Sequence, residues 1–116
     1  MTINASFGNI KQLLASMEPS GLPKTVLSGD PQMSDAELAD TDKLNAGVWS
    51  SQVGSWRIDG WSVNEVMVIQ SGRALLTEDD GPVTELGPGD AFFAPKGWKG
   101  TWETLEPVQK FYVIVY

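Results

Sequence analysis

The chain contains no histidine and no cysteine among its 116 residues. The absence of cysteine excludes disulfides, zinc–thiolate sites and cysteine nucleophiles, and it fits a cytoplasmic protein. The absence of histidine removes the commonest general base and the commonest transition-metal ligand. Any metal site would therefore need oxygen ligands, which favour magnesium, calcium or manganese.

A long hydrophobic run and an excess of basic residues are also missing. No segment approaches the ~20 consecutive apolar residues that a membrane-spanning helix needs, and the N-terminus has no secretory signal pattern. The chain has 15 acidic and 8 basic residues and a net charge of −7. This charge argues against nucleic acid and against a membrane surface as partners, because both attract clustered Lys and Arg. The length fits one domain with a modest core.

From Gly47 onward, short segments with a strand pattern alternate with strong turn signals such as Gly87-Pro88-Gly89-Asp90. The segments are rich in aromatic and β-branched residues, which favour strands. Many short strands without long helices between them are typical of an all-β sandwich or barrel. The predicted strands cover residues 47–53, 55–61, 64–70, 72–78, 82–86, 91–94, 98–104 and 109–116.

The first third of the chain has a different pattern. Apolar residues recur at helical spacing over residues 9–17, which predicts a short helix there. A short strand is expected at 24–27, and the sequence of 34–37 predicts a second helix start through a capping box. We therefore expect an irregular or helical N-terminal segment, residues 1–23, and a single β-domain, residues 24–116.

Two spaced patterns within the strand region carry a family resemblance. Glu65 is followed by six residues and then Gly72, and Gly89 is followed by five residues and then Pro95-x-Gly97. These patterns resemble the end of the first signature motif of the cupin superfamily and the start of the second. The resemblance implies a double-stranded β-helix, which is the jelly-roll barrel of the cupins.

The run from Gly87 to Glu103 resembles more specifically a small cupin subfamily. This subfamily groups with ureidoglycine aminohydrolase and the ethanolamine-utilisation cupins, and its members often carry a label of unknown function. The resemblance extends over about residues 24–116. It is informative about the fold and less so about the activity, because one fold hosts many chemistries.

Metal-binding cupins hold a divalent ion inside the barrel through three His and one Glu, and this chain departs from that pattern. The His-x-His pair would fall near Asp59 and Trp61, and the second-motif His and Asn positions hold Gly100 and Thr104. Only the glutamate position, Glu65, is retained. We therefore predict no metal cofactor, with a divalent metal on oxygen ligands as the alternative.

Glu65 is the candidate catalytic residue. Strand alternation points Glu65, Met67 and Ile69 into the barrel, and a buried carboxylate needs a partner or a task. The structural alternative is a pairing with Arg57 or with a tryptophan N–H. The candidate ligand-binding residues are Arg57, Asp59, Trp61, Glu65, Met67, Trp98 and Trp102.

Each of these candidates also has an ordinary structural interpretation. The tryptophans either line a pocket or fill the core. Asp59 either faces the cavity or belongs to an Asp-Gly turn. Arg57 either clamps an anionic ligand or lies on a strand surface. Trp49 and Trp56 are expected in the core or at an interface.

Three functions follow from these features. The first is a metal-free module that binds a small polar molecule, such as an amine or a ureide, in a tryptophan-lined barrel. The second, implied by the resemblance, is an enzyme like ureidoglycine aminohydrolase, with Glu65 as general acid or base. The third is a non-catalytic homodimeric module, in which the strand near 24–28 pairs with a partner subunit.

Overall fold

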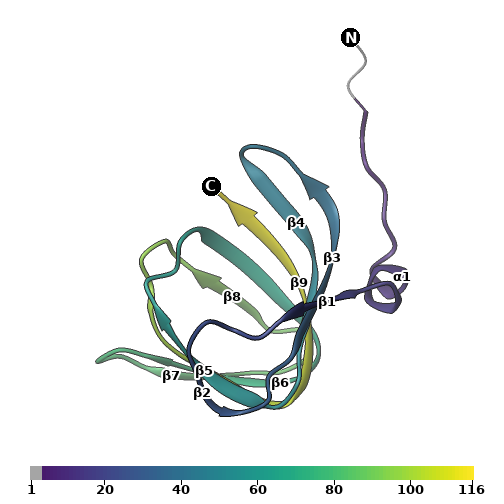
Figure 1. The fold of residues 1–116 in the computed structure, drawn as a ribbon. Helices are drawn as coiled ribbons and strands as arrows, with labels where there is room; N and C mark the ends of the chain where they lie inside the picture. The colour runs from purple at the N-terminus through teal and green to yellow at the C-terminus, as the bar shows by residue number, and fades with distance from the viewer. Residues whose placement is uncertain (1–3) are drawn as a thin grey trace.

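The computed structural model describes residues 4–116. Within them, one short helix precedes nine strands that join into a single curled sheet (Figure 1). This architecture confirms the prediction of an all-β barrel. The elements are α1 (Ile10–Ala15), β1 (Glu18–Gly21), β2 (Val26–Gly29), β3 (Met33–Asp40), β4 (Leu44–Ser51), β5 (Gly54–Asp59), β6 (Asn64–Glu78), β7 (Val83–Leu86), β8 (Ala91–Ala94) and β9 (Lys99–Val115).

The sheet is organised around the two longest strands, β6 and β9, which pair antiparallel along most of their length. The first part of β9 also pairs with β5, and its last part pairs with β4. In the same way, β6 pairs with β8 near its start and with β7 near its end. These two strands therefore bend through the whole sheet and close it around an interior.

The sequence prediction placed a turn at Gly72 and ended a strand at residue 104, and both breaks are wrong. β6 continues through Gly72, and β9 continues from residue 99 to residue 115. Gly72 has a φ of +80°, and the pairing of β6 with β9 is irregular on both sides of it. The turn signal therefore marks a sharp bend within one long strand rather than the end of the strand.

The expected N-terminal helix is confirmed by α1, whose N-cap Asn9 accepts a hydrogen bond from the Gln12 amide at 3.1 Å. The helix start expected at 34–37 is wrong, because these residues lie in β3 and pair with β4. Backbone hydrogen bonds to a neighbouring strand outweigh the local capping preference there. Among residues 4–116, no helix is long and apolar enough to cross a membrane.

Two strands from the N-terminal part of the protein lie at the two ends of the strand order β1-β3-β4-β9-β5-β2. β2 overlaps the strand expected at 24–27 and pairs with β5. β1 was not predicted, and it pairs with β3 from within the segment assigned to the N-terminal region. α1 lies outside the barrel (Figure 1). The division of the chain at residue 23 stays a prediction.

The core fills one end of the curled sheet. Its apolar side chains come from β5, β6 and β9, with Leu86 of β7, Ala94 of β8 and Trp98, whose ring makes an edge contact with Phe92 at 6.1 Å. Alternation along β6 is as predicted, since Met67 and Ile69 are each 1% exposed and Val66 is 47% exposed. The inward face of the same strands continues beyond the core and lines a cavity.

The bend at Gly72 makes a stability prediction. We expect Gly72→Ala to lower the free energy of unfolding by about 2–3 kcal/mol, because a non-glycine residue is strained at positive φ. Its Cβ would in addition collide with the backbone of Pro107 and Val108. Urea unfolding followed by tryptophan fluorescence measures the loss.

Gly89→Ala is the matched control. Gly89 has a similar φ of +87°, but a Cβ there meets no atom within 4 Å. Its loss should therefore stay near 1 kcal/mol, which is about the backbone cost alone. Equal losses at both positions would contradict the close approach of β6 to β9.

Candidate ligand site in the barrel

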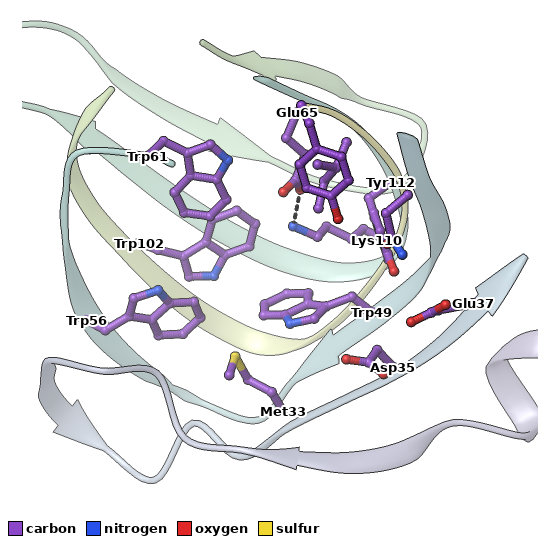
Figure 2. A pocket seen from close by; sticks show the side chains of 13 residues that line it. Met33, Asp35, Glu37, Trp49, Trp56, Trp61, Glu65, Trp102, Lys110 and Tyr112 are labelled. Atoms are coloured by element: carbon purple, nitrogen blue, oxygen red, sulfur yellow. Dashed lines mark hydrogen bonds and ion pairs between the residues drawn. The ribbon is translucent and has the colours of Figure 1, made fainter. Parts of the chain in front are cut away.

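The curled sheet encloses a cavity of about 390 Å³ (Figure 2). Most of its lining comes from the inward faces of β3, β4, β6 and β9, and the rest comes from β5 and from the segment before β6. The size falls in the range of small-molecule sites, about 300–1,000 Å³. The lining side chains are Met33, Asp35, Glu37, Asn45, Trp49, Trp56, Trp61, Glu65, Trp102, Lys110, Tyr112, Ile114 and Tyr116.

Strand register explains why these residues meet. Asp35 on β3 pairs with Trp49 on β4, which in turn pairs with Lys110 on β9. In the same way, Ile114 on β9 pairs with Glu65 on β6. Because side chains alternate between the two faces of a sheet, residues in one such row point to the same side. Segments far apart in the sequence therefore contribute to one surface.

A buried ion pair lies in the wall of the cavity. The Lys110 ammonium donates a hydrogen bond to Glu65 Oε2 at 2.6 Å, and the two side chains are only 5% and 4% exposed. Lys110 Nζ also lies 4.4 Å from the Trp49 ring centroid and 5.0 Å from that of Trp102. Lysine is almost never fully buried unless it is paired. Here the carboxylate and two indole faces together replace the water that the ammonium gives up.

The tryptophans form a connected aromatic wall. The rings of Trp56 and Trp102 stack at 5.7 Å, and Trp49 makes an edge contact with Trp102 at 5.5 Å. Trp102 Nε1 donates to Thr104 Oγ1 at 2.9 Å, and that hydroxyl donates to Ser51 at 3.0 Å. The wall is therefore held by hydrogen bonds as well as by packing, so it is rigid before any ligand arrives.

Trp61 closes another side of the cavity. Its backbone N–H donates to the Trp98 carbonyl at 2.8 Å, and its carbonyl accepts from the Gly97 N–H at 2.7 Å. These two bonds tie Trp61 to the Pro95-x-Gly97 turn. Its indole Nε1 is buried and has no hydrogen-bond partner among the described residues. The indole N–H of Trp98 in the core is unpaired as well, so it is the position of Trp61 on the cavity lining that makes its N–H a candidate donor to a ligand oxygen.

Tyr112 supplies a second polar group. The residue is 7% exposed, and its hydroxyl, which keeps some accessible surface, takes part in none of the side-chain hydrogen bonds within the part of the chain that the structure describes. Burial raises the pKa of Tyr112 to about 12, and the nearby carboxylates of Asp35, Glu37 and Glu65 add to the rise. The hydroxyl therefore stays protonated at neutral pH and can donate a hydrogen bond into the cavity.

The structure brings together three of the residues predicted as site residues. Trp61, Glu65 and Trp102 all line the cavity. Met67 is 1% exposed and does not line it, but its sulfur lies 3.9 Å from Lys110 Nζ and supports the ion pair from behind. Trp98 also does not line the cavity, since its ring fills the core.

Arg57 and Asp59 were expected at the cavity, and the structure corrects this placement. The side chains of Trp56 and Ile58 on β5 belong to the core, so Arg57 and Asp59, which alternate with them, face the other side of the sheet. Arg57 forms two hydrogen bonds with the Asp79 carboxylate, at 2.5 and 2.6 Å, and lies 3.7 Å from Asp59. This pairing holds the pKa of Asp79 below its usual value. Arg57 and Asp59 thus form an ion-pair group outside this cavity, and they line a second, neighbouring pocket that shares Trp56 and Trp61 with it.

Sequence reasoning missed Lys110, Tyr112 and the acidic residues of β3. The signal for Lys110 was present, because it shares the parity of Val108, Tyr112 and Ile114, which are otherwise apolar or aromatic inward positions. A lysine at an inward position of such a strand predicts a buried partner. Asp35 was missed because it was read as part of a helix start.

The residues at the family's metal positions do not fit a metal ion. The Asp59 side chain is 77% exposed on the outer surface. Gly100 has no side chain that could coordinate a metal. A larger residue would not fit there either, because its Cβ would collide with the Thr77 carbonyl and the Trp98 ring. Glu65 is engaged with Lys110. Within residues 4–116, no group of three or more His, Cys, Asp or Glu is arranged to hold a metal.

Comparison with known families agrees with this fold. The family model described as the EutQ-like cupin domain matches residues 38–112, which is more than half of the chain. The chain belongs to the EutQ-like cupin family. This assignment confirms the predicted cupin resemblance. The predicted relationship of this cupin to ureidoglycine aminohydrolase stays a prediction. No curated protein sequence matches the chain.

Solved structures resemble this cupin over most of its length. A protein of unknown function from Pseudomonas syringae pv. tomato, of the DUF861 family, is 29% identical with a TM-score of 0.80 over 88% of this chain. The match covers only 45% of that protein, so this cupin spans less than half its length.

Two further structures share the fold at lower identity. A Rhizobium leguminosarum protein of unknown function is 19% identical with a TM-score of 0.70, over 99% of this chain and 98% of its own. The Clostridium difficile EutQ protein is 16% identical with a TM-score of 0.65, over 78% of this chain and 75% of its own. These likenesses concern the fold alone.

The Glu65–Lys110 pair of this cupin makes a prediction for stability. Lys110→Met leaves the Glu65 carboxylate buried without its partner, and we expect a loss of about 3 kcal/mol in the free energy of unfolding. The double variant Glu65→Met/Lys110→Met should recover most of that loss, because no unpaired charge remains. Urea unfolding of the single and double variants gives the coupling energy.

The outer pair provides the control. Arg57→Gln breaks a more exposed ion pair and should cost less than about 1 kcal/mol. Additive losses from Glu65→Met and Lys110→Met would contradict the buried pairing.

Tyr112 makes a pH prediction. Its pKa of about 12 lies above the ordinary value of 10.0, so between these pH values the unfolded chain loses a proton that the folded chain keeps. The stabilisation linked to this group is therefore complete below pH 10 and decreases as the pH rises toward 12. Tyr112→Phe should show a shallower loss of stability across this window. The difference in ultraviolet absorbance between the two proteins should titrate near pH 12, and a midpoint at pH 10 would contradict the buried placement.

Proposed function

We propose that this cupin binds a small polar molecule in its tryptophan-lined cavity without a metal ion. The observation that carries the proposal is the Glu65–Lys110 ion pair in the cavity wall. The carboxylate that the resemblance assigns to a metal site is bonded to an ammonium group of the same chain. The carboxylate at the family's metal position is thus neutralised by a group of the protein itself.

The rest of the wall supports binding rather than simple packing. The indole rings offer flat apolar faces to a ligand, and the indole N–H of Trp61 and the hydroxyl of Tyr112 have no partners among the described residues. A few unpaired polar groups in a mostly apolar cavity are the usual features of a small-molecule site. A ligand that hydrogen-bonds to these groups would satisfy them at once.

The enzyme alternative has less support. The resemblance to ureidoglycine aminohydrolase would involve metal chemistry, and the side chains at the corresponding positions supply too few donors. Glu65 remains the candidate general acid or base of that alternative, with its Oε2 atom engaged by Lys110. No arrangement of the described residues favours turnover over binding.

Calorimetry against a panel of amines, ureides and sugars tests the proposal. We expect saturable binding by at least one class, at one molecule per chain, with the same affinity in the presence of EDTA. Trp61→Phe keeps an aromatic ring but removes the unpaired N–H, so it should weaken binding of a ligand with an oxygen acceptor about five- to tenfold. Tryptophan fluorescence offers an independent readout.

Arg57→Gln is the control for this series. Arg57 lies outside the cavity, so its variant should bind as the unmodified protein does. Absence of binding across the entire panel would refute the proposed function. Loss of binding in EDTA would refute the metal-free part of the proposal alone.

A further inference from the structure

The charges around the cavity are unbalanced. Three carboxylates line it, on Asp35, Glu37 and Glu65, and among the described residues Lys110 is the only Lys or Arg that does so. These groups leave a net charge of −2 on the lining. Glu65 and Lys110 neutralise each other, so the excess lies on β3.

The two carboxylates on β3 have no cationic partner. Within residues 4–116, none of the ion pairs within 4.0 Å includes Asp35 or Glu37. Asp35 and Glu37 occupy alternate positions of β3 and line the cavity together. Figure 2 shows them across the cavity from Trp56, Trp61 and Trp102. A positively charged ligand would relieve their mutual repulsion, and an anionic ligand would increase it.

The aromatic wall is also suited to a cation. Lys110 Nζ already lies within 4.4 Å of the Trp49 ring centroid and 5.0 Å of the Trp102 centroid, so this wall stabilises an ammonium group in the protein itself. The faces of Trp56 and Trp61 complete the lining. Indole faces beside carboxylates are the arrangement that recognises alkylammonium groups in proteins.

The Tyr112 hydroxyl is an independent indication of a ligand. Tyr112 is 7% exposed as a residue and lines the same cavity, and its hydroxyl keeps some accessible surface and takes part in none of the side-chain hydrogen bonds among residues 4–116. Together with the free N–H of Trp61 it provides donors for an oxygen atom on the ligand. The cavity therefore offers negative charge and aromatic faces to a cation, and donors to a neighbouring oxygen.

From these features we infer that the ligand of the cavity is a small organic cation of the alkylammonium class that carries an oxygen acceptor. This inference rests on the proposed function and narrows it to one charge class. Asp35 and Glu37 would attract the cation, and the tryptophan faces would pack against its alkyl groups. Lys110 stays bonded to Glu65 and contributes to the wall on which the ligand packs.

Calorimetry with matched probes tests the charge class directly. Choline is the cationic probe, 3,3-dimethyl-1-butanol is its uncharged analogue of the same shape, and 3,3-dimethylbutyrate is the anion. We expect choline to bind at least tenfold more tightly than the uncharged analogue, and the anion to bind more weakly than both. Choline binding should also weaken as salt is raised from about 0.01 to 0.15 M, because salt screens the carboxylates of Asp35 and Glu37.

Two double variants separate local charge from net charge. Asp35→Asn/Glu37→Gln should weaken choline at least fivefold and leave the uncharged analogue unchanged. Asp80→Asn/Glu103→Gln removes the same charge from residues that do not line the cavity, so it should leave choline binding unaltered. Far-ultraviolet circular dichroism confirms that both variants are folded.

The outcomes distinguish the inference from the function on which it rests. Binding of the uncharged or anionic probe as tightly as choline overturns the cation class and leaves the proposed binding function standing. Equal loss of choline affinity in both double variants also overturns it. If choline does not bind at all, the cation inference fails, and the proposed function is then decided by the amine, ureide and sugar panel.

Discussion

The antiparallel pairing of β6 with β9 is the constraint on which the other features depend. These two strands run through the whole sheet, and β4, β5, β7 and β8 are each paired to one of them. Glu65 lies on β6 and Lys110 lies on β9, so the buried ion pair joins the same two strands through their side chains. Backbone register and side-chain charge thus favour one alignment, because a slip of either strand by one residue would turn its charged group to the other face, away from its partner.

The ion pair also has a cost, since two charges leave water when the barrel closes. Such a pair is seldom stabilising by itself, and it needs good geometry and further polar or aromatic contacts. Lys110 obtains these from Trp49 and Trp102. We interpret the pair as contributing to the alignment of β6 with β9 more than to stability, because an apolar pair would fill the same space without joining two specific positions.

Much of the fold was accessible from the sequence, and less of the site was. Strand alternation correctly pointed Glu65 and Met67 inward, and turn residues located most strand ends. The failures occurred where long-range pairing overrides local preference, as in β3, where a capping pattern lies within a strand. Lys110 was missed because its partner is 45 positions away in the chain. Arg57 and Asp59 were misplaced because their facing depends on which residues of β5 are buried.

Trp61 shows which structural role the turn of the second cupin motif has in this chain. Its backbone is bonded on both sides to the Pro95-x-Gly97 turn, at 2.8 and 2.7 Å, while the position that would present a histidine holds Gly100. The turn of the motif therefore holds a wall of the cavity and positions no metal ligand. The signature motif in this protein thus indicates the fold, and it does not by itself indicate the metal chemistry found in other cupins. Assigning reactions to such barrels from the turn residues alone would predict a metal site in this chain, whereas the described side chains at the corresponding positions do not fit one.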